Sequence, residues 1–482
     1  MGTQVELKNE FSKLRISEKL SNYIVTTSFE DLPEKAIKSA KMTILDSITC
    51  MLGGVFTPAG EILTAVIAKE GGPLESTIIG TGHKTSALLA AFTNSHLANA
   101  LDFDDYYPLC HPSATIVPPG IAVSEAYDGD GKTFITSVVI ASEVHLRIMD
   151  SILGSTEQQF KIFGPATHQT FGAVVAAGKI LQLNEEQMAR AIGIAGANAP
   201  VPCNLKTFRG DTVTMVKNPY GTASFVSVLA AKLAKSGFIG PLDIFEGDTG
   251  FWRMSGSDLF DPSKMTEGLG RDFKITKIAF KPYPCCRWTH SSLDGIFQIV
   301  EKNKISPDKV KKVEVRTFSI GTKPFLSKSH PKTFTDVQFS TKYLMSLAIL
   351  KIPPGLNWYR KELRNSEEVL RLADKIILID DEEANSCYPT RLLSKVTLYT
   401  PEATFRARVE FPRGAPENPM GEEDLKKKFL KVSEGILDDS QRYQCLEFIQ
   451  DLERKDNLRE LTNLLTFKDK ELGKMRRGIF FD

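Results

Sequence analysis

Residues 86–101 read SALLAAFTNSHLANAL, a stretch of helical length rich in Ala and free of Asp, Glu, Lys and Arg. Five further Ala-rich segments of helical length lie at residues 35–51, 132–148, 171–181, 185–197 and 222–235. Gly, Pro or Asn separates them, as expected for the ends of helices. Small side chains let helices pack closely. The pattern predicts a large all-α part with no nucleotide-binding βαβ unit, and no G-x-G-x-x-G or Walker sequence is present.

Beyond residue 278 the pattern changes to alternating apolar and polar side chains. It occurs at residues 310–318 (VKKVEVRTF), 394–399 and 404–411 (TFRARVEF). Such alternation is typical of half-buried antiparallel strands, and the last two form an expected hairpin around residues 400–403. Helical patterns at 291–301 and 339–350 lie between the strands. We therefore expect a smaller α+β domain.

The charged helical segments 422–433 and 441–465 follow this domain, and we expect them to pack back on the helical part. The predicted protein is mainly α. It has a large helical domain at 1–272, an inserted α+β lid domain at 273–415 and C-terminal helices at 416–482.

Composition limits the possible partners. The 482 residues carry a net charge of +1, which provides no overall field for nucleic acid or an anionic membrane. No stretch approaches the roughly 20 apolar residues of a membrane span, and the polar residues 1–12 contain no apolar secretion segment. Seven scattered Cys do not form a disulfide framework. These features predict a cytoplasmic protein without nucleic-acid or membrane partners.

Three carboxylates and an imidazole follow the quoted stretch: Asp102, Asp104, Asp105 and His111. A carboxylate can fix the tautomer of a neighbouring His and raise its pKa toward neutral pH, which prepares the ring to move a proton. The structural alternative is a helix that ends in a solvated acidic loop. The cluster could also bind a divalent cation, which we consider less favoured because no second His supports it. We expect no metal here.

The segment 281–290, KPYPCCRWTH, lies at the junction of the two predicted domains. It brings together Lys281, Arg287 and His290, and clefts between domains are frequent ligand sites. A Lys and an Arg together suit a ligand with several carboxylates; the alternative is a solvated surface loop. Cys285 and Cys286 lack the spacing of a zinc site, and we interpret them as packing residues, with a nucleophilic Cys near His290 as the alternative.

Two further residues complete the candidates. Lys217 lies in an otherwise uncharged stretch before the 222–235 helix, where it either anchors a substrate carboxylate or extends to solvent. His168 precedes the 171–181 helix and is a candidate second proton carrier.

Several of these segments resemble the MmgE/PrpD family, which includes 2-methylcitrate dehydratases and cis-aconitate decarboxylases. The matching pieces are residues 41–47 (KMTILDS), 100–105 with 111–113 (HPS), 143–148 (EVHLRI), 216–217, 281–290 and 336–343 (DVQFSTKY). The resemblance implies a large helical domain, a smaller lid, a homodimer, and activity without metal or organic cofactor.

The resemblance also implies roles for individual residues. Asp102, His111, Lys217, Lys281 and His290 match positions that line a pocket for di- or tricarboxylates between helical domain and lid. Lys217, Lys281 and Arg287 would hold carboxylates, while His111, oriented by Asp102, would transfer the proton. Tyr106, which stands where many members have Thr, is a further expected substrate contact.

The chain departs from the family pattern at two other places. His168 is shifted relative to a family His, and Ile320 stands near a position where the animal decarboxylases have a lid Tyr.

The sequence thus predicts a cofactor-independent lyase that moves a proton next to a carboxylate. The leading expectation is a carbon–oxygen lyase, a hydro-lyase acting as a dehydratase of the 2-methylcitrate or citrate type. Decarboxylation of cis-aconitate and epimerisation of a small dicarboxylate are the alternatives on the same fold. A non-catalytic carboxylate-binding protein is the alternative from another class.

Overall fold

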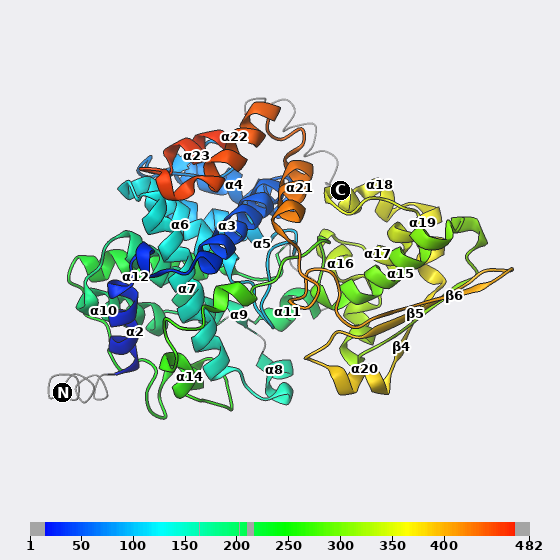
Figure 1. Cartoon of the computed structure of the whole chain (residues 1–482), viewed down its shortest axis with the longest axis horizontal. Coiled ribbons are helices and arrows are strands. Elements are labelled where there is room, and N and C mark those ends of the chain that lie inside the picture. Colours follow the sequence, from blue (N-terminus) through cyan, green and yellow to red (C-terminus); the bar gives the residue numbers. More distant parts are fainter. Residues whose placement is uncertain (1–14, 163, 202, 210–215, 468–482) are drawn as a thin grey trace.

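The computed structural model describes residues 15–162, 164–201, 203–209 and 216–467, and it is mainly helical (Figure 1). Residues 1–12, expected to carry no secretion segment, lie outside this range. Among the described helices, none is by itself both long and apolar enough to cross a bilayer. One sharply bent pair, α3 with α4, meets those criteria jointly, by length and composition only.

The first part of the chain folds into a cluster of helices, called here the helical part. Its helices are α2 (Ile16–Thr26), α3 (Glu34–Gly54), α4 (Pro58–Glu70), α5 (Ala87–Asn99), α6 (Ser113–Tyr127), α7 (Gly131–Ile152), α8 (Thr156–Ile162), α9 (Pro165–Ile180), α10 (Glu185–Ala197), α11 (Asn204–Arg209), α12 (Tyr220–Lys235), α13 (Phe251–Met254) and α14 (Ser263–Thr266). All six Ala-rich segments are helical, in α3, α5, α7, α9, α10 and α12, although 86–101 extends beyond both ends of α5 and 171–181 extends one residue beyond α9.

One detail of the all-α expectation is wrong. Strands β1 (Ser76–Thr77) and β2 (Lys84–Thr85) form a short antiparallel pair before α5. The buried Glu125 carboxylate accepts hydrogen bonds from the backbone N–H and the hydroxyl of Thr77, at 2.7 and 2.6 Å. This tertiary contact holds β1 in place, and two-residue strands carry no readable alternation in the sequence.

Helix α5 runs through the centre of the helical part and packs against α3, α6 and α12. Its N-cap Ser86 hydroxyl accepts a hydrogen bond from Leu89 N–H at 3.3 Å, and residues 93–99 are all buried. A Cβ atom at Gly54 would lie 2.1 Å from the Leu97 carbonyl oxygen, so α3 and α5 approach as closely as only Gly allows. This packing fixes the end of α5, where the acidic loop begins.

A four-stranded sheet forms the second part of the molecule. Its strands are β3 (Lys312–Thr317), β4 (Ile376–Asp380), β5 (Ser394–Tyr399) and β6 (Thr404–Val409), in the order β4-β3-β5-β6. The pairs β3–β5 and β5–β6 are antiparallel and β3–β4 is parallel. The three predicted strands and the hairpin are confirmed. Strand β4 was not predicted because its run IILID does not alternate, even though β4 is an edge strand with Ile377 exposed.

Helices cover one face of this sheet (Figure 1). They include α15 (His290–Asn303), α17 (Thr341–Ile349) and α19 (Glu367–Asp374). This part of the chain also contains α16 (Phe334–Phe339), α18 (Lys361–Arg364) and α20 (Glu382–Cys387), and α20 lies on the other side of the strands in Figure 1. Helix α15 packs on β5 and β6, α17 packs against α15 and α19, and α20 contacts β3. Residues 290–409 are called here the sheet-containing part.

The chain then returns to the helical part. The helices are α21 (Glu422–Ser433), α22 (Asp439–Gln450) and α23 (Arg459–Leu464), and the first two pack against α3. Lys428 of α21 places its Nζ 2.7 Å from Asp46 Oδ1 of α3 and 2.6 Å from the Phe103 carbonyl oxygen. Lys428 and Asp46 are buried, so this ion pair joins the end of the chain to the core beneath the acidic loop.

Replacement of Lys428 by Met should lower the free energy of unfolding by about 3 kcal/mol, because it leaves the Asp46 carboxylate buried without its cation. Urea unfolding of the purified protein measures this change. Lys426→Met, in the same helix but partly exposed and paired with Glu422, is the matched control and should change the stability by less than about 1 kcal/mol. Equal effects of the two substitutions would contradict a structural role for the buried pair.

Candidate functional site

The acidic loop between α5 and α6 is held at both ends by hydrogen bonds. The Asp105 carboxylate accepts from the backbone N–H and hydroxyl of Ser113, at 3.1 and 2.7 Å, and so caps the start of α6. Tyr106 exchanges backbone hydrogen bonds of 2.8 and 2.9 Å with Ala279. Asp105 therefore has a structural role, and the loop is tied to the junction segment.

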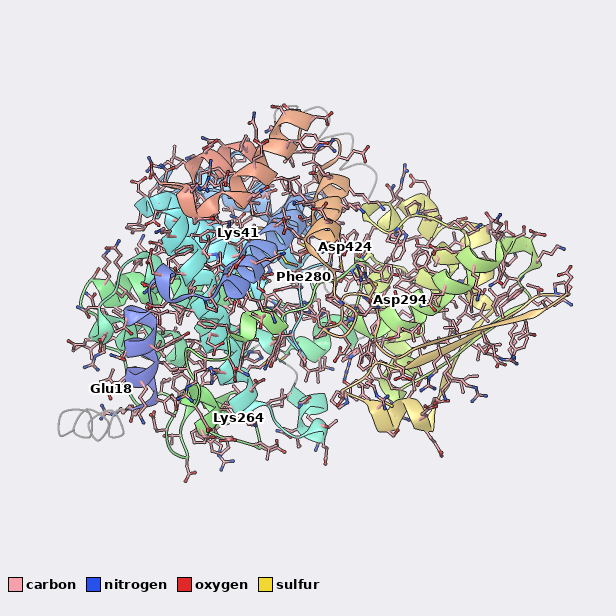
Figure 2. All side chains as sticks on the ribbon, in the orientation of Figure 1. Glu18, Lys41, Lys264, Phe280, Asp294 and Asp424 are labelled. Atoms are coloured by element: carbon pink, nitrogen blue, oxygen red, sulfur yellow. The ribbon has the colours of Figure 1, made fainter. Side chains whose placement is uncertain are left out.

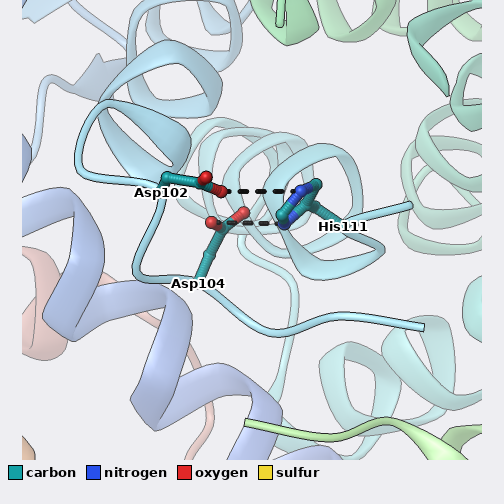
Figure 3. A group of neighbouring side chains, drawn as sticks. All are labelled: Asp102, Asp104 and His111. Atoms are coloured by element: carbon teal, nitrogen blue, oxygen red, sulfur yellow. Dashed lines mark ion pairs between the residues drawn. The ribbon is translucent and has the colours of Figure 1, made fainter. Parts of the chain in front are cut away.

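His111 lies buried at the end of this loop, with Asp102 and Asp104 facing its two ring nitrogens (Figure 3). Its Nδ1 is 3.0 Å from the Asp105 carbonyl oxygen, which can only accept, so Nδ1 carries the proton. Its Nε2 is 3.0 Å from Lys217 Nζ, which donates to it. The neutral ring therefore presents an Nε2 lone pair toward Lys217.

Two Lys side chains converge on one carboxylate. Asp102 Oδ1 accepts from Lys217 Nζ at 2.9 Å and from Lys281 Nζ at 2.6 Å, and Lys281 also donates to the Asp102 carbonyl oxygen at 2.8 Å. All three side chains are buried. Burial opposes the charge on Asp102, yet the two ammonium groups lower its pKa well below the ordinary value. The second carboxylate oxygen, Oδ2, has no hydrogen-bond partner among the described residues.

The pKa of His111 is lower than the usual 6.5, whereas the sequence led us to expect carboxylates to raise it. Burial is the main cause and the positive charge of Lys217 is the next, and together they outweigh Asp104. Asp102 does not orient the ring directly, since its Oδ1 lies 3.7 Å from Nε2. The Asp105 carbonyl and Asp104 orient the ring, while Asp102 positions the two Lys. His111 is consequently neutral at pH 7.

Asn and Gln side chains fix the position of this cluster through hydrogen bonds. Asn99 Nδ2 donates to both Asp104 oxygens at 2.9 and 3.0 Å, and Asn218 Nδ2 donates to Asn99 Oδ1 at 3.0 Å. Gln169 of α9 accepts from the His111 backbone N–H at 3.2 Å and donates to its carbonyl at 2.7 Å. We did not single out these amides from the sequence, although Asn218 directly follows Lys217. The role of such buried amides depends on the residues they contact in the folded protein, so local sequence does not reveal it.

The donor atoms of Asp102, Asp104 and His111 lie close enough together to hold a metal ion. In this structure, however, the ammonium groups of Lys217 and Lys281 occupy the space on Asp102 where a cation would bind. A divalent ion there would be within a few ångströms of two positive charges and would be strongly repelled. The donor set therefore fits ammonium groups better than a metal.

The cluster opens into a cavity of about 440 Å³ at the junction of the helical and sheet-containing parts. His111, Lys217, Tyr106 and Arg287 line it. Figure 2 labels Phe280, which precedes Lys281 in the junction segment, at the meeting of the two parts. Gly414 packs against this segment with a φ of 86°, and a Cβ atom there would lie 1.9 Å from the Phe280 carbonyl oxygen. The close approach brings the two walls of the cavity together.

Arg287 faces the cavity from the junction segment, with its guanidinium 4.4 Å from the centre of the Tyr106 ring. It donates to the carbonyl oxygens of Pro412 and Arg413 at 3.1 and 2.8 Å. His290, which does not line the cavity, is buried behind Arg287 with Nδ1 3.0 Å from its Nη1. His290 thus contacts the candidate ligand-binding Arg rather than the cavity.

Two other candidates lie apart from the cavity. Lys281 is fully buried, and among the described residues its Nζ donates hydrogen bonds to Asp102 alone. His168 lines a separate cavity of about 70 Å³, and its Nδ1 is 3.0 Å from Nε2 of His145. Burial lowers the pKa of His168 to about 3. The structure therefore does not bring His168 together with His111, and a proton-carrying role for it stays a prediction.

The two neighbouring Cys do not form a nucleophilic site with His290. Cys286 lines the cavity, and burial raises its pKa to about 11, so its thiol stays protonated at neutral pH. Cys285 is buried with its Sγ 3.2 Å from the Thr289 hydroxyl, and His290 Nε2 faces the Cys285 carbonyl oxygen. This agrees with packing roles for both Cys.

Fold and site together define a mainly helical protein with a buried Lys–Asp–His cluster that opens at the edge of a sheet-containing part. The chain belongs to the MmgE/PrpD family: residues 18–261 match the MmgE/PrpD N-terminal domain and residues 283–454 match the MmgE/PrpD C-terminal domain.

Similar proteins include a cis-aconitate decarboxylase of Aspergillus terreus, 25% identical over 94% of this chain and 96% of the relative. A cis-aconitate decarboxylase-like protein, oryM, of Aspergillus oryzae is 22% identical over 94% of this chain and 97% of the relative. A cis-aconitate decarboxylase of Homo sapiens is 22% identical over 93% of this chain and 94% of the relative.

Replacement of Lys217 by Met should raise the pKa of His111, because it removes a positive charge 3.0 Å from Nε2. A pH titration followed by NMR of the His ring protons measures the shift, with His111→Gln identifying the resonance. Lys277→Met is the matched control, since Lys277 is exposed at the cavity and its charge is screened by solvent. A His111 pKa that stays constant or falls in Lys217→Met would contradict this electrostatic coupling.

Proposed function

We propose that the protein is a lyase that acts on a small carboxylic acid with several carboxylates, and that its reaction is the decarboxylation of a cis-aconitate-type acid. The observation that carries this proposal is the buried Lys217–His111 pair at one end of the cavity. The similarity to cis-aconitate decarboxylases along almost the whole chain supports the choice of reaction.

The residues that line the cavity suit the binding of carboxylates. Lys217 supplies a compact positive charge, and Arg287 supplies a planar guanidinium that can bind a carboxylate with two hydrogen bonds. Lys281 would act through Asp102, whose position it fixes. A carboxylate bound to Lys217 would cancel the charge that lowers the His111 pKa. Substrate binding would therefore favour proton uptake by His111.

Decarboxylation needs one proton delivered to carbon. The bond between a carboxylate carbon and its neighbouring methylene breaks and carbon dioxide leaves. The electron pair moves into a new double bond, and the original alkene shifts its electrons to the far carbon. Nε2 of His111 first takes a proton from Lys217 across 3.0 Å and then gives it to that carbon. The buried cations offset the negative charge that develops.

Dehydration of a 2-methylcitrate-type acid, our leading expectation from the sequence, becomes the second candidate. One observation favours it: the Lys217–His111 pair offers a proton donor and a neutral base side by side. His111 would remove the proton next to a carboxylate while Lys217 protonates the departing hydroxyl. We further propose that residues 273–415 act as a lid that closes over the bound acid.

Proton NMR of the protein in deuterated buffer with cis-aconitate, citrate and 2-methylcitrate tests these reactions. Decarboxylation releases carbon dioxide and leaves one deuterium on the product, whereas dehydration yields an alkene acid with all carboxylates retained. His111→Gln should lower kcat by a factor of about 10² or more, because it removes the proton carrier.

His330→Gln is the matched control, since this exposed His pairs with Asp374 away from the cavity. It should leave turnover unchanged. Full activity of His111→Gln would exclude His111 as the proton carrier, and conversion of none of the three acids would overturn the proposed reactions.

A further inference from the structure

One side of the cavity is apolar and belongs to a second hydrophobic cluster, separate from the main core. The members of this cluster that line the cavity are Cys286, Trp288, Phe339, Tyr388 and Leu392. Ring contacts hold them in place: Phe325 lies 6.3 Å from Trp288 and 6.2 Å from Phe339, measured between ring centres. The apolar wall is therefore part of a packed hydrophobic cluster.

The rest of the lining extends this wall. Leu109, Phe411 and Pro412 add further apolar surface. Burial raises the pKa of Tyr388 to about 12, so its side chain also stays uncharged at neutral pH. A cavity of about 440 Å³ with such walls is larger and less polar than an acid of a few carboxylates requires, because carboxylates bind through charges and hydrogen bonds.

Only two buried cations line the cavity among the described residues, Lys217 and Arg287. Arg287 bonds to neutral carbonyl oxygens, and its Nε has no hydrogen-bond partner among the described residues. The remaining charged lining groups, Lys277 and Glu417, are exposed and opposite in sign. The cavity thus offers two cations to bound carboxylates, although Lys217 is already paired with Asp102. Any further carboxylate against the apolar wall would lose its hydration without a partner.

We infer that the natural substrate is an acid that places two of its carboxylates against Lys217 and Arg287 and carries an aliphatic substituent of several carbons against the second hydrophobic cluster. This inference takes the carboxylate skeleton of the substrate from the proposed function and adds an aliphatic substituent to it. Lys217 connects the two regions, since its Nζ lies 5.8 Å from the centre of the Phe339 ring. A substituent next to the reacting carbons would therefore reach the apolar wall directly.

Isothermal titration calorimetry of the full chain with cis-aconitate and with cis-aconitates that bear a methyl or a hexyl group on the alkene CH carbon tests the inference. Each methylene that is buried should tighten binding about fourfold, so the hexyl acid should bind at least about tenfold more tightly than cis-aconitate. A hexyl acid that binds no more tightly than cis-aconitate overturns the inference.

Variants of two cavity-lining residues show where the hexyl group binds. Trp288→Ala and Phe411→Ala should each reduce the preference for the hexyl acid at least about threefold and leave the Kd of cis-aconitate within about twofold, since each removes only apolar surface. Phe411 is partly exposed just after strand β6, so its replacement serves even if Trp288→Ala fails to fold. Trp252→Ala is the matched control, because Trp252 stacks on Phe260 outside the cavity. A preference that survives both cavity variants overturns the inference.

Turnover measured in parallel separates this inference from the proposed function. Tighter binding of the hexyl acid that depends on Trp288 or Phe411, without conversion of any acid, supports the apolar subsite and overturns the proposed reactions. Conversion of cis-aconitate with exclusion of the hexyl acid overturns the subsite and leaves the proposed function standing.

Discussion

The arrangement of the site depends on one buried carboxylate that holds two ammonium groups. Asp102 follows α5, Lys217 precedes α12, and Lys281 lies in the junction segment, so the contact joins three distant stretches of the chain. Burying such charges is costly unless each has partners, and loss of Asp102 would leave two buried ammonium groups without this carboxylate. The contact therefore constrains where α5 ends, how α12 begins and where the sheet-containing part is attached. His111 takes its electrostatic character from this arrangement.

That character is unusual for a buried His between carboxylates. His111 is buried, flanked by carboxylates and still has a lowered pKa, because burial and Lys217 outweigh Asp104. In the absence of an anionic ligand, the neutral imidazole accepts a hydrogen bond from the Lys217 ammonium group. An anionic ligand would shift the balance toward the protonated ring, so the site couples carboxylate binding to proton uptake without any moving part. The fixed amides of Asn99 and Gln169 keep the geometry while the charge changes.

Many helices, strands and site residues could be predicted from local sequence. The features that could not be predicted depend on contacts between distant parts of the chain. Ala-rich segments and strand alternation predicted six helices and three strands because burial follows the period of each element. Strand β4 does not alternate, and the β1–β2 pair depends on Glu125, which is distant in sequence. Asp102, His111, Lys217 and Lys281 were singled out by residue type and come together. The direction of the His111 pKa and the separate position of His168 depend on burial and packing, which no local pattern shows.

The apolar wall and the charged cluster reinforce each other. The aromatic ring of Phe339 excludes water from one side of Lys217, and charges interact more strongly where water is absent. A carbanion that forms next to a carboxylate would then be stabilised by ammonium groups whose fields are little screened. The same wall would also offer a surface for an aliphatic group. The apolar lining of this cavity can therefore have two effects. Excluding water strengthens the electrostatic stabilisation of a developing charge, and it also drives the binding of an aliphatic group.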